Sequence, residues 1–139
     1  MRQAQETLTI RTEGPGLYEF TDAVRRWTAA QAIETGLLTL FSRHTSASLV
    51  IQENADPQVI DDLQNFFRRL VPNGDPLFRH VAEGPDDMPA HVKSALTATS
   101  LNIPISERRP MFGTWQGIYL FEHRDAPHRR QVTLHLLGD

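Results

Sequence analysis

Apolar residues along the chain repeat at two spacings, one typical of strands and one typical of helices. Residues 3–12 alternate loosely between polar and apolar and predict a strand, which a Gly-Pro-Gly turn at 14–16 ends. Apolar side chains then recur at helical spacing as far as Ile33. This stretch predicts a helix that has Thr21 as its N-cap and runs to Glu34.

The second predicted helix has the clearest start. Asp56 is a capping residue, and Pro57 occupies the first helical position, where its missing N–H costs nothing. Pro72 ends the helix. Its apolar stripe consists of Val59, Ile60, Leu63, Phe66, Phe67 and Leu70.

The rest of the chain adds strands and one short helix. Residues 75–89 are dense in Pro, Gly and Asp and predict a long loop, which in a compact domain is usually functional or disordered. A short helix over 89–97 follows. The predicted strands are 37–41, 49–51, 101–105, 118–123 and 131–137. Because helices and strands do not alternate in the regular βαβ order, we expect a single α+β domain over residues 1–139 with a mixed or antiparallel sheet.

Composition excludes several classes of function. A formal net charge of −3 gives no electrostatic case for nucleic-acid binding. Cysteine is absent, so any metal must be held by His, Asp or Glu. No apolar run approaches the ~20 residues of a membrane span, and the first residues lack the apolar core of a signal peptide. We therefore expect a cytoplasmic protein without a membrane partner.

Three of the six histidines lie in compact polar clusters. His44 precedes the hydroxyl residues Thr45, Ser46 and Ser48. An imidazole beside hydroxyls can bind an oxyanion, although the same hydroxyls suit a turn that satisfies backbone N–H groups. Both readings of this segment stay open.

Asp87 and His91 form the second cluster. They are four residues apart, so a helix that starts near Pro89 brings them to the same end. A carboxylate beside an imidazole suits a metal site or an oriented general base. Asp86 and Asp87 also suit the N-cap of that helix.

Glu122 and His123 end a predicted strand, so their side chains should point to opposite faces of the sheet. Upstream of that strand, residues 113–117 predict a tight loop whose N–H groups could face an anion. Lys93 and the pair Arg108 and Arg109 are available phosphate partners, although surface cations are usually just solvated.

Four segments together resemble the YjbQ family, which is identified as a secondary thiamine-phosphate synthase family. They are HTSASL at 44–49, ENADP at 53–57, EGPDDMPAHVKS at 83–94 and GTWQGIYLFEHR at 113–124. The resemblance implies an α+β homotrimer with pockets near the subunit contacts. It also implies a weak thiamine-phosphate synthase activity, which joins a pyrimidine diphosphate to thiazole phosphate and releases pyrophosphate.

The polar positions of these motifs are the site that the resemblance implies: His44, Asn54, Asp56, Asp87, His91, Gln116, Glu122 and His123. Many relatives carry Cys where this chain has Phe121, so a thiol cannot be required here. We expect a catalytic group of His44, Asp87, His91, Glu122 and His123. We expect metal ligation by His44, His91 and His123, and cofactor or substrate contacts from Asn54, Lys93 and Gln116.

Metal identity and reaction class stay open at this point. Histidine-rich ligation favours zinc, whereas carboxylates acting with substrate phosphates favour magnesium. The first hypothesis is an enzyme that acts on a phosphorylated small molecule. The alternatives are a non-enzymatic trimer that binds a metal ion or phosphorylated metabolite, and a hydrolase in which a metal activates water.

Overall fold

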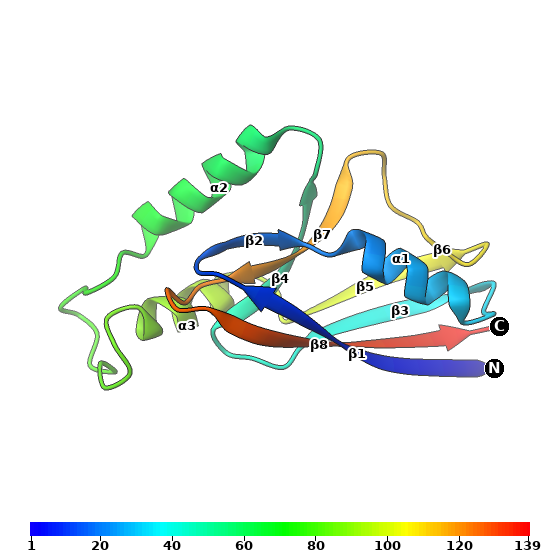
Figure 1. The fold of residues 1–139 in the computed structure, drawn as a ribbon, viewed down its shortest axis with the longest axis horizontal. Coiled ribbons are helices and arrows are strands. Elements are labelled where there is room, and N and C mark those ends of the chain that lie inside the picture. Colours follow the sequence, from blue (N-terminus) through cyan, green and yellow to red (C-terminus); the bar gives the residue numbers. More distant parts are fainter.

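The computed structural model describes all 139 residues, which form two antiparallel sheets and three helices (Figure 1). The five-stranded sheet has the order β1-β8-β3-β5-β6, and the three-stranded sheet has the order β2-β7-β4. The larger sheet comprises β1 (Arg2–Thr12), β3 (Thr35–Ser42), β5 (Ser100–Ser106), β6 (Arg109–Pro110) and β8 (His128–Gly138). The smaller comprises β2 (Gly16–Glu19), β4 (Ala47–Glu53) and β7 (Gln116–Glu122). These elements confirm the predicted α+β class.

The core lies along one face of each sheet and follows strand parity. On β8, Val132, Leu134 and Leu136 are fully buried, and on β7 the same holds for Ile118 and Leu120. Alternate residues of a strand share a face, so Arg130 and Glu122 continue these two apolar rows. The core therefore ends in a charged pair rather than in solvent.

The helices are α1 (Thr21–Ala30), α2 (Pro57–Leu70) and α3 (Asp87–Leu96). The predicted start of α2 is confirmed, because the Asp56 side chain accepts a hydrogen bond of 2.9 Å from the Gln58 N–H. Figure 1 shows α2 reaching away from the body of the molecule. It touches the smaller sheet through Phe67, whose ring meets that of Phe121 edge-on at 5.2 Å.

Two predicted helix ends were wrong. Thr21 is the first helical residue rather than the N-cap, because its hydroxyl donates to the Glu19 carboxylate and accepts from the Ile118 N–H. The same helix ends at Ala30 instead of Glu34, and Ala32 has a positive φ of 53°, which a continuing helix cannot adopt.

Two short strands, β2 and β6, were not predicted. The third helix begins at Asp87, two residues before the predicted start, and Asp86 caps it without a side-chain hydrogen bond. None of the three helices has the length and apolar content that crossing a membrane requires.

Candidate metal centre

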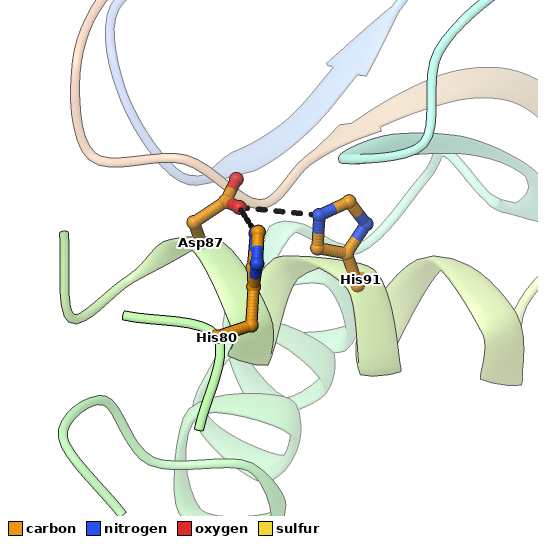
Figure 2. Close-up of side chains that lie close together, drawn as sticks. All are labelled: His80, Asp87 and His91. Carbon is orange, nitrogen blue, oxygen red and sulfur yellow. Dashed lines mark hydrogen bonds and ion pairs between the residues drawn. The ribbon is translucent and has the colours of Figure 1, made fainter. Parts of the chain in front are cut away.

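Two histidines and one aspartate converge at the start of α3 (Figure 2). Asp87 opens the helix, His91 follows one turn later, and His80 comes from the loop between α2 and α3. The Asp87 Oδ2 atom lies 2.8 Å from His80 Nε2 and 3.1 Å from His91 Nε2. One ligand atom from each residue lies within 4.8 Å of the other two, so all three can contact one ion.

The Asp87 carboxylate is held in this orientation from behind. Its Oδ1 atom accepts a 2.7 Å hydrogen bond from the Arg124 guanidinium, which leaves Oδ2 for the two imidazoles. Burial alone would raise the pKa of Asp87, but the hydrogen bond from His80 and the charge of Arg124 outweigh it and lower that pKa. A carboxylate fixed and kept ionised in this way is a suitable metal ligand.

Arg124 joins this cluster to its surroundings. It also donates from Nε to Asp86 Oδ2 at 2.9 Å and from its remaining nitrogen to the Glu83 carbonyl at 3.0 Å. Asp86 Oδ2 in turn accepts the Asp125 N–H. Asp86, which was predicted to cap the helix, therefore positions Arg124 instead.

The donor set fits a transition ion of the zinc type. Two imidazole nitrogens and one carboxylate oxygen are the protein ligands of one common catalytic zinc arrangement, in which a fourth position stays open. His80 is half exposed and His91 less so, which leaves room for a further ligand. The hydrogen bond with Asp87 raises the pKa of His80, so a bound ion would have to displace a proton at mildly acidic pH.

A cavity of about 610 Å³ opens beside the cluster, with His91 in its wall. The other polar residues of this wall are Ser42, Arg43, His44, Thr45, Ser94 and Thr99. The Ser94 hydroxyl is buried and has no hydrogen-bond partner in the chain. One cation, several hydroxyls and a neighbouring candidate metal site together suit a phosphorylated ligand.

His44 lies in the wall of this cavity but does not belong to the metal-competent group, which consists of His80, Asp87 and His91. Its Nε2 atom accepts a 2.7 Å hydrogen bond from the backbone N–H of Gln131, so that nitrogen is occupied. Burial, followed by the charge of Arg130, lowers the pKa of His44. Its Nδ1 atom lies 3.4 Å from Arg130 Nη1, a group that can only donate, so this nitrogen faces the guanidinium and is not a free donor for a ligand.

Glu122 and Arg130 form a buried ion pair at the end of the core. Glu122 is fully buried, and its Oε1 atom accepts hydrogen bonds from Arg130 Nε at 2.8 Å and from the Thr12 hydroxyl at 2.6 Å. Burial alone would raise the pKa of Glu122, but these hydrogen bonds lower it. The pair connects β7 to the larger sheet.

His123 points to the other side of β7. Its Nε2 atom lies 2.9 Å from the Ser48 hydroxyl, and Ser48 Oγ accepts a 2.6 Å hydrogen bond from Thr97. Burial lowers the pKa of His123 to about 3, with a further contribution from Lys93, so the ring is neutral at physiological pH. Within one chain, the three predicted histidines therefore do not meet around one ion, and only His91 belongs to the metal-competent group.

Three further predicted residues lie at the opposite end of the smaller sheet from Glu122. The β4–β7 register pairs Ala47 with Glu122 at one end and Glu53 with Gln116 at the other. Six residues of strand separate these ends, a distance of roughly 20 Å. Asn54, Asp56 and Gln116 lie at the far end, where Asn54 donates to Glu19 and Gln116 accepts the Gly113 N–H.

Sequence reasoning missed His80 as a candidate metal ligand. The loop around it was recognised as a functional candidate, but no fixed spacing relates His80 to Asp87 and His91 across an irregular loop. Only the path of the loop brings its imidazole to Asp87 (Figure 2).

Fold and site define a small α+β protein with a His-Asp-His group at the start of a short helix. The chain belongs to the family described as UPF0047 protein YjbQ-like, whose model matches residues 6–139. It is 52% identical to UPF0047 protein sll1880 from Synechocystis sp. over 138 residues, which cover 99% of this chain and 94% of the relative. It is 43% identical over 137 residues to UPF0047 protein YjbQ from Escherichia coli O157:H7, covering 97% of this chain and 98% of that one.

A solved structure has the same fold. The crystal structure of hypothetical protein APE1520 from Aeropyrum pernix K1 superposes with a TM-score of 0.89 at 30% sequence identity. The match covers 98% of this chain and 99% of that chain. Family membership and fold are thus established over almost the whole sequence.

Proposed function

We propose that this protein binds a divalent transition metal ion through His80, Asp87 and His91 and holds a phosphorylated small molecule beside it. The observation that carries the proposal is the convergence of three ligand atoms at the wall of a cavity of about 610 Å³. His91 belongs to both features. A ligand in the cavity would therefore reach the open position of the ion.

The charges near the cavity support a phosphorylated ligand. The ion would supply Lewis-acid stabilisation of phosphate oxygens when bound. Arg43 adds a guanidinium to the wall. Arg124 keeps Asp87 oriented, and the hydroxyls of Thr45 and Ser94 can bind remaining oxygens.

The reaction that the family resemblance implies, formation of thiamine phosphate with release of pyrophosphate, is compatible with this chemistry. A diphosphate that leaves accumulates negative charge, which cationic groups stabilise. The support is the charge and size of the cavity. No nucleophile of this chain is required, because the thiazole nitrogen attacks and Phe121 stands where many relatives have Cys.

A homotrimer remains part of the proposal. It is supported by α2, a 14-residue amphipathic helix in which no residue is buried. Phe66 and Leu70 on this helix are 49% and 52% exposed. Apolar side chains on an element that reaches away from the body are typical of a surface that another subunit covers (Figure 1).

The metal part is tested by titrating Zn²⁺ into chelator-treated protein and measuring binding by calorimetry. Wild type should bind one ion per chain, and His91→Ala and Asp87→Asn should weaken binding at least tenfold. His135→Ala is the matched control, because His135 lies on the face of β8 opposite the core and its side chain bonds only Gln3. Equal affinity in wild type and His91→Ala would contradict the assignment.

The reaction is tested separately, with both thiamine-phosphate precursors and metal-loaded protein. Multiple turnovers that His91→Ala abolishes would support a synthase. Stabilisation by a precursor without turnover would favour a binding protein, and release of inorganic phosphate from either precursor alone would favour a hydrolase. None of these outcomes changes the interpretation of the Zn²⁺ titration, which is a separate experiment.

A further inference from the structure

A second cavity lies on the opposite side of α3 from the metal cluster. It measures about 240 Å³ and is lined by α2, by α3 and by the end of β7. His91 faces the first cavity and Lys93 lines the second. Residues that are two apart on a helix point ~200° away from each other around its axis. The helix α3 therefore separates the two cavities.

Lys93 is the first unusual group in this cavity. Lys93 is only 8% exposed, yet its ammonium group forms no ion pair with any carboxylate of the chain. An ammonium group enclosed in this way without a carboxylate partner is costly. Arg68 of α2 contributes a second cation to the same wall.

His123 is the second unusual group. The residue is 2% exposed, lines the cavity, and its Nδ1 atom is buried without any hydrogen-bond partner. Buried polar nitrogens are almost always paired, so an orphan at a cavity wall indicates a missing partner. This observation is independent of the two cations.

The hydrogen-bond chain behind His123 allows two states of this atom. The Thr97 hydroxyl lies 2.6 Å from Ser48 Oγ and 2.9 Å from the Lys93 carbonyl, and it has one proton for these two acceptors. When Thr97 donates to Ser48, the Ser48 proton goes to His123 Nε2, and Nδ1 carries the ring proton. An oxyanion at Nδ1 favours this arrangement, because it requires a donor there.

The acidic groups nearby do not cancel the positive charge of this cavity. Glu122 also lines the cavity, but its carboxylate is paired with Arg130. Asp125 is exposed to solvent and accepts a long hydrogen bond of 3.4 Å from Asn73. Two cations and one neutral donor then face a single unpaired carboxylate.

We propose that this cavity binds a small oxyanion, a phosphate or carboxylate group, between Lys93, Arg68 and the Nδ1–H of His123. The site is distinct from the metal centre, with α3 between them. An oxyanion with two or more acceptor oxygens would satisfy the orphan nitrogen and compensate the buried ammonium together. A space of about 240 Å³ accommodates such a group but not a large ligand.

The test titrates inorganic phosphate into chelator-treated full-length protein at constant ionic strength, with chloride as the reference salt and acetate as the carboxylate probe. Backbone and imidazole NMR signals report saturation. Arg68→Gln and Lys93→Met should each weaken binding about tenfold or more. Arg69→Gln is the matched control, because it removes a neighbouring charge of α2 that lies outside the cavity wall.

The two probes distinguish the source of the oxyanion. Saturation by phosphate alone assigns a phosphate site, and saturation by acetate alone assigns a carboxylate site. Saturation by neither, or equal binding by wild type and Arg68→Gln, overturns the proposal. Arg68 is exposed on α2, so this variant tests the site even if Lys93→Met does not fold.

The tautomer gives a second readout. In the oxyanion-bound protein, the ¹⁵N shift of His123 Nδ1 should be that of a protonated nitrogen, and its N–H proton should lie downfield. Ser48→Ala removes the donor to Nε2 and should weaken oxyanion binding. An Nδ1 shift typical of an unprotonated nitrogen in the saturated wild type would overturn the role assigned to His123. Because chelated protein is used, failure here leaves the metal proposal untouched.

Discussion

Glu122 and His123 are neighbours in the chain, but their side chains leave β7 on opposite faces. Glu122 pairs with Arg130 of the larger sheet, while His123 bonds Ser48 of β4. Both side chains are buried in different layers of the molecule, but only Glu122 has all its polar atoms paired, because His123 Nδ1 has no partner. Strand parity, read from the sequence, predicted this separation.

The ion pair of Glu122 should be important for stability. Glu122→Gln leaves the Arg130 charge buried without a partner, and we expect a loss of about 3 kcal/mol or more in the free energy of unfolding. Glu34→Gln is the control, because it removes an exposed ion pair with Arg108 and should cost less than about 1 kcal/mol. Urea denaturation measures both. Equal losses would show that burial of the Glu122 pair contributes nothing.

Stability should fall as the pH drops from about 6.5 towards 3. His123 has a folded pKa of about 3 against the ordinary 6.5, so in this window the unfolded chain binds the extra proton. One group gives a slope of at most ~1.4 kcal/mol per pH unit. The lowered pKa of His44 acts in the same sense. The raised pKa of His80 opposes it, because its contribution is lost as the pH rises.

An NMR titration isolates the His123 contribution. Its ring carbon signals should stay constant from pH 8 to pH 4 in the folded protein. In the chain unfolded by urea, the same signals should titrate near 6.5. A midpoint above pH 5 for His123 in the folded protein would contradict its burial as a neutral ring.

Arg124 should control metal affinity without touching the ion. Arg124→Gln frees Asp87 Oδ1, so the carboxylate loses its fixed orientation, and we expect Zn²⁺ affinity to fall about 10- to 100-fold. Arg129→Gln, on the exposed face of β8, is the matched control and should leave affinity unchanged. Thermal denaturation of both variants checks that the fold survives. An unchanged affinity in folded Arg124→Gln would remove Arg124 from the metal site.

The proposed trimer should dissociate when a charge is placed on the apolar face of α2. Light scattering after size exclusion should give three times the chain mass of 15.8 kDa for wild type. Phe66→Glu places a charge on the exposed apolar face of α2 and should reduce the mass to that of one chain. Asp61→Asn, elsewhere on this helix, is the control. A monomeric wild type would refute the trimer.

Local chemistry made some elements predictable. Asp56 and Pro57 carry the start of α2 in adjacent residues, and the structure confirms it. The strand Gly16–Glu19 was missed because it overlaps a Gly-Pro-Gly turn and exists only by pairing with β7, about a hundred residues away in sequence. The division of strands between two sheets depends on such distant pairing, which periodicity does not report.

The candidate site was predictable where a helix fixed the geometry. Asp87 and His91 lie one turn apart, and the structure brings them together as this spacing predicted. His80 was missed because its approach depends on a loop. One ring nitrogen of His44 is bonded to the Gln131 N–H, and one of His123 is bonded to the Ser48 hydroxyl. No sequence pattern distinguishes an imidazole that is already hydrogen-bonded in this way from a free one.

The loop that carries His80 has a kinetic consequence. Asp87 and His91 keep their places as long as α3 is folded, whereas His80 can leave whenever residues 71–86 open, without disturbing either sheet. An ion held this way would exchange at the rate of loop opening rather than at the rate of global unfolding. We therefore expect a centre that loads and unloads quickly, and a loop that proteases cut far more slowly once the ion is in place.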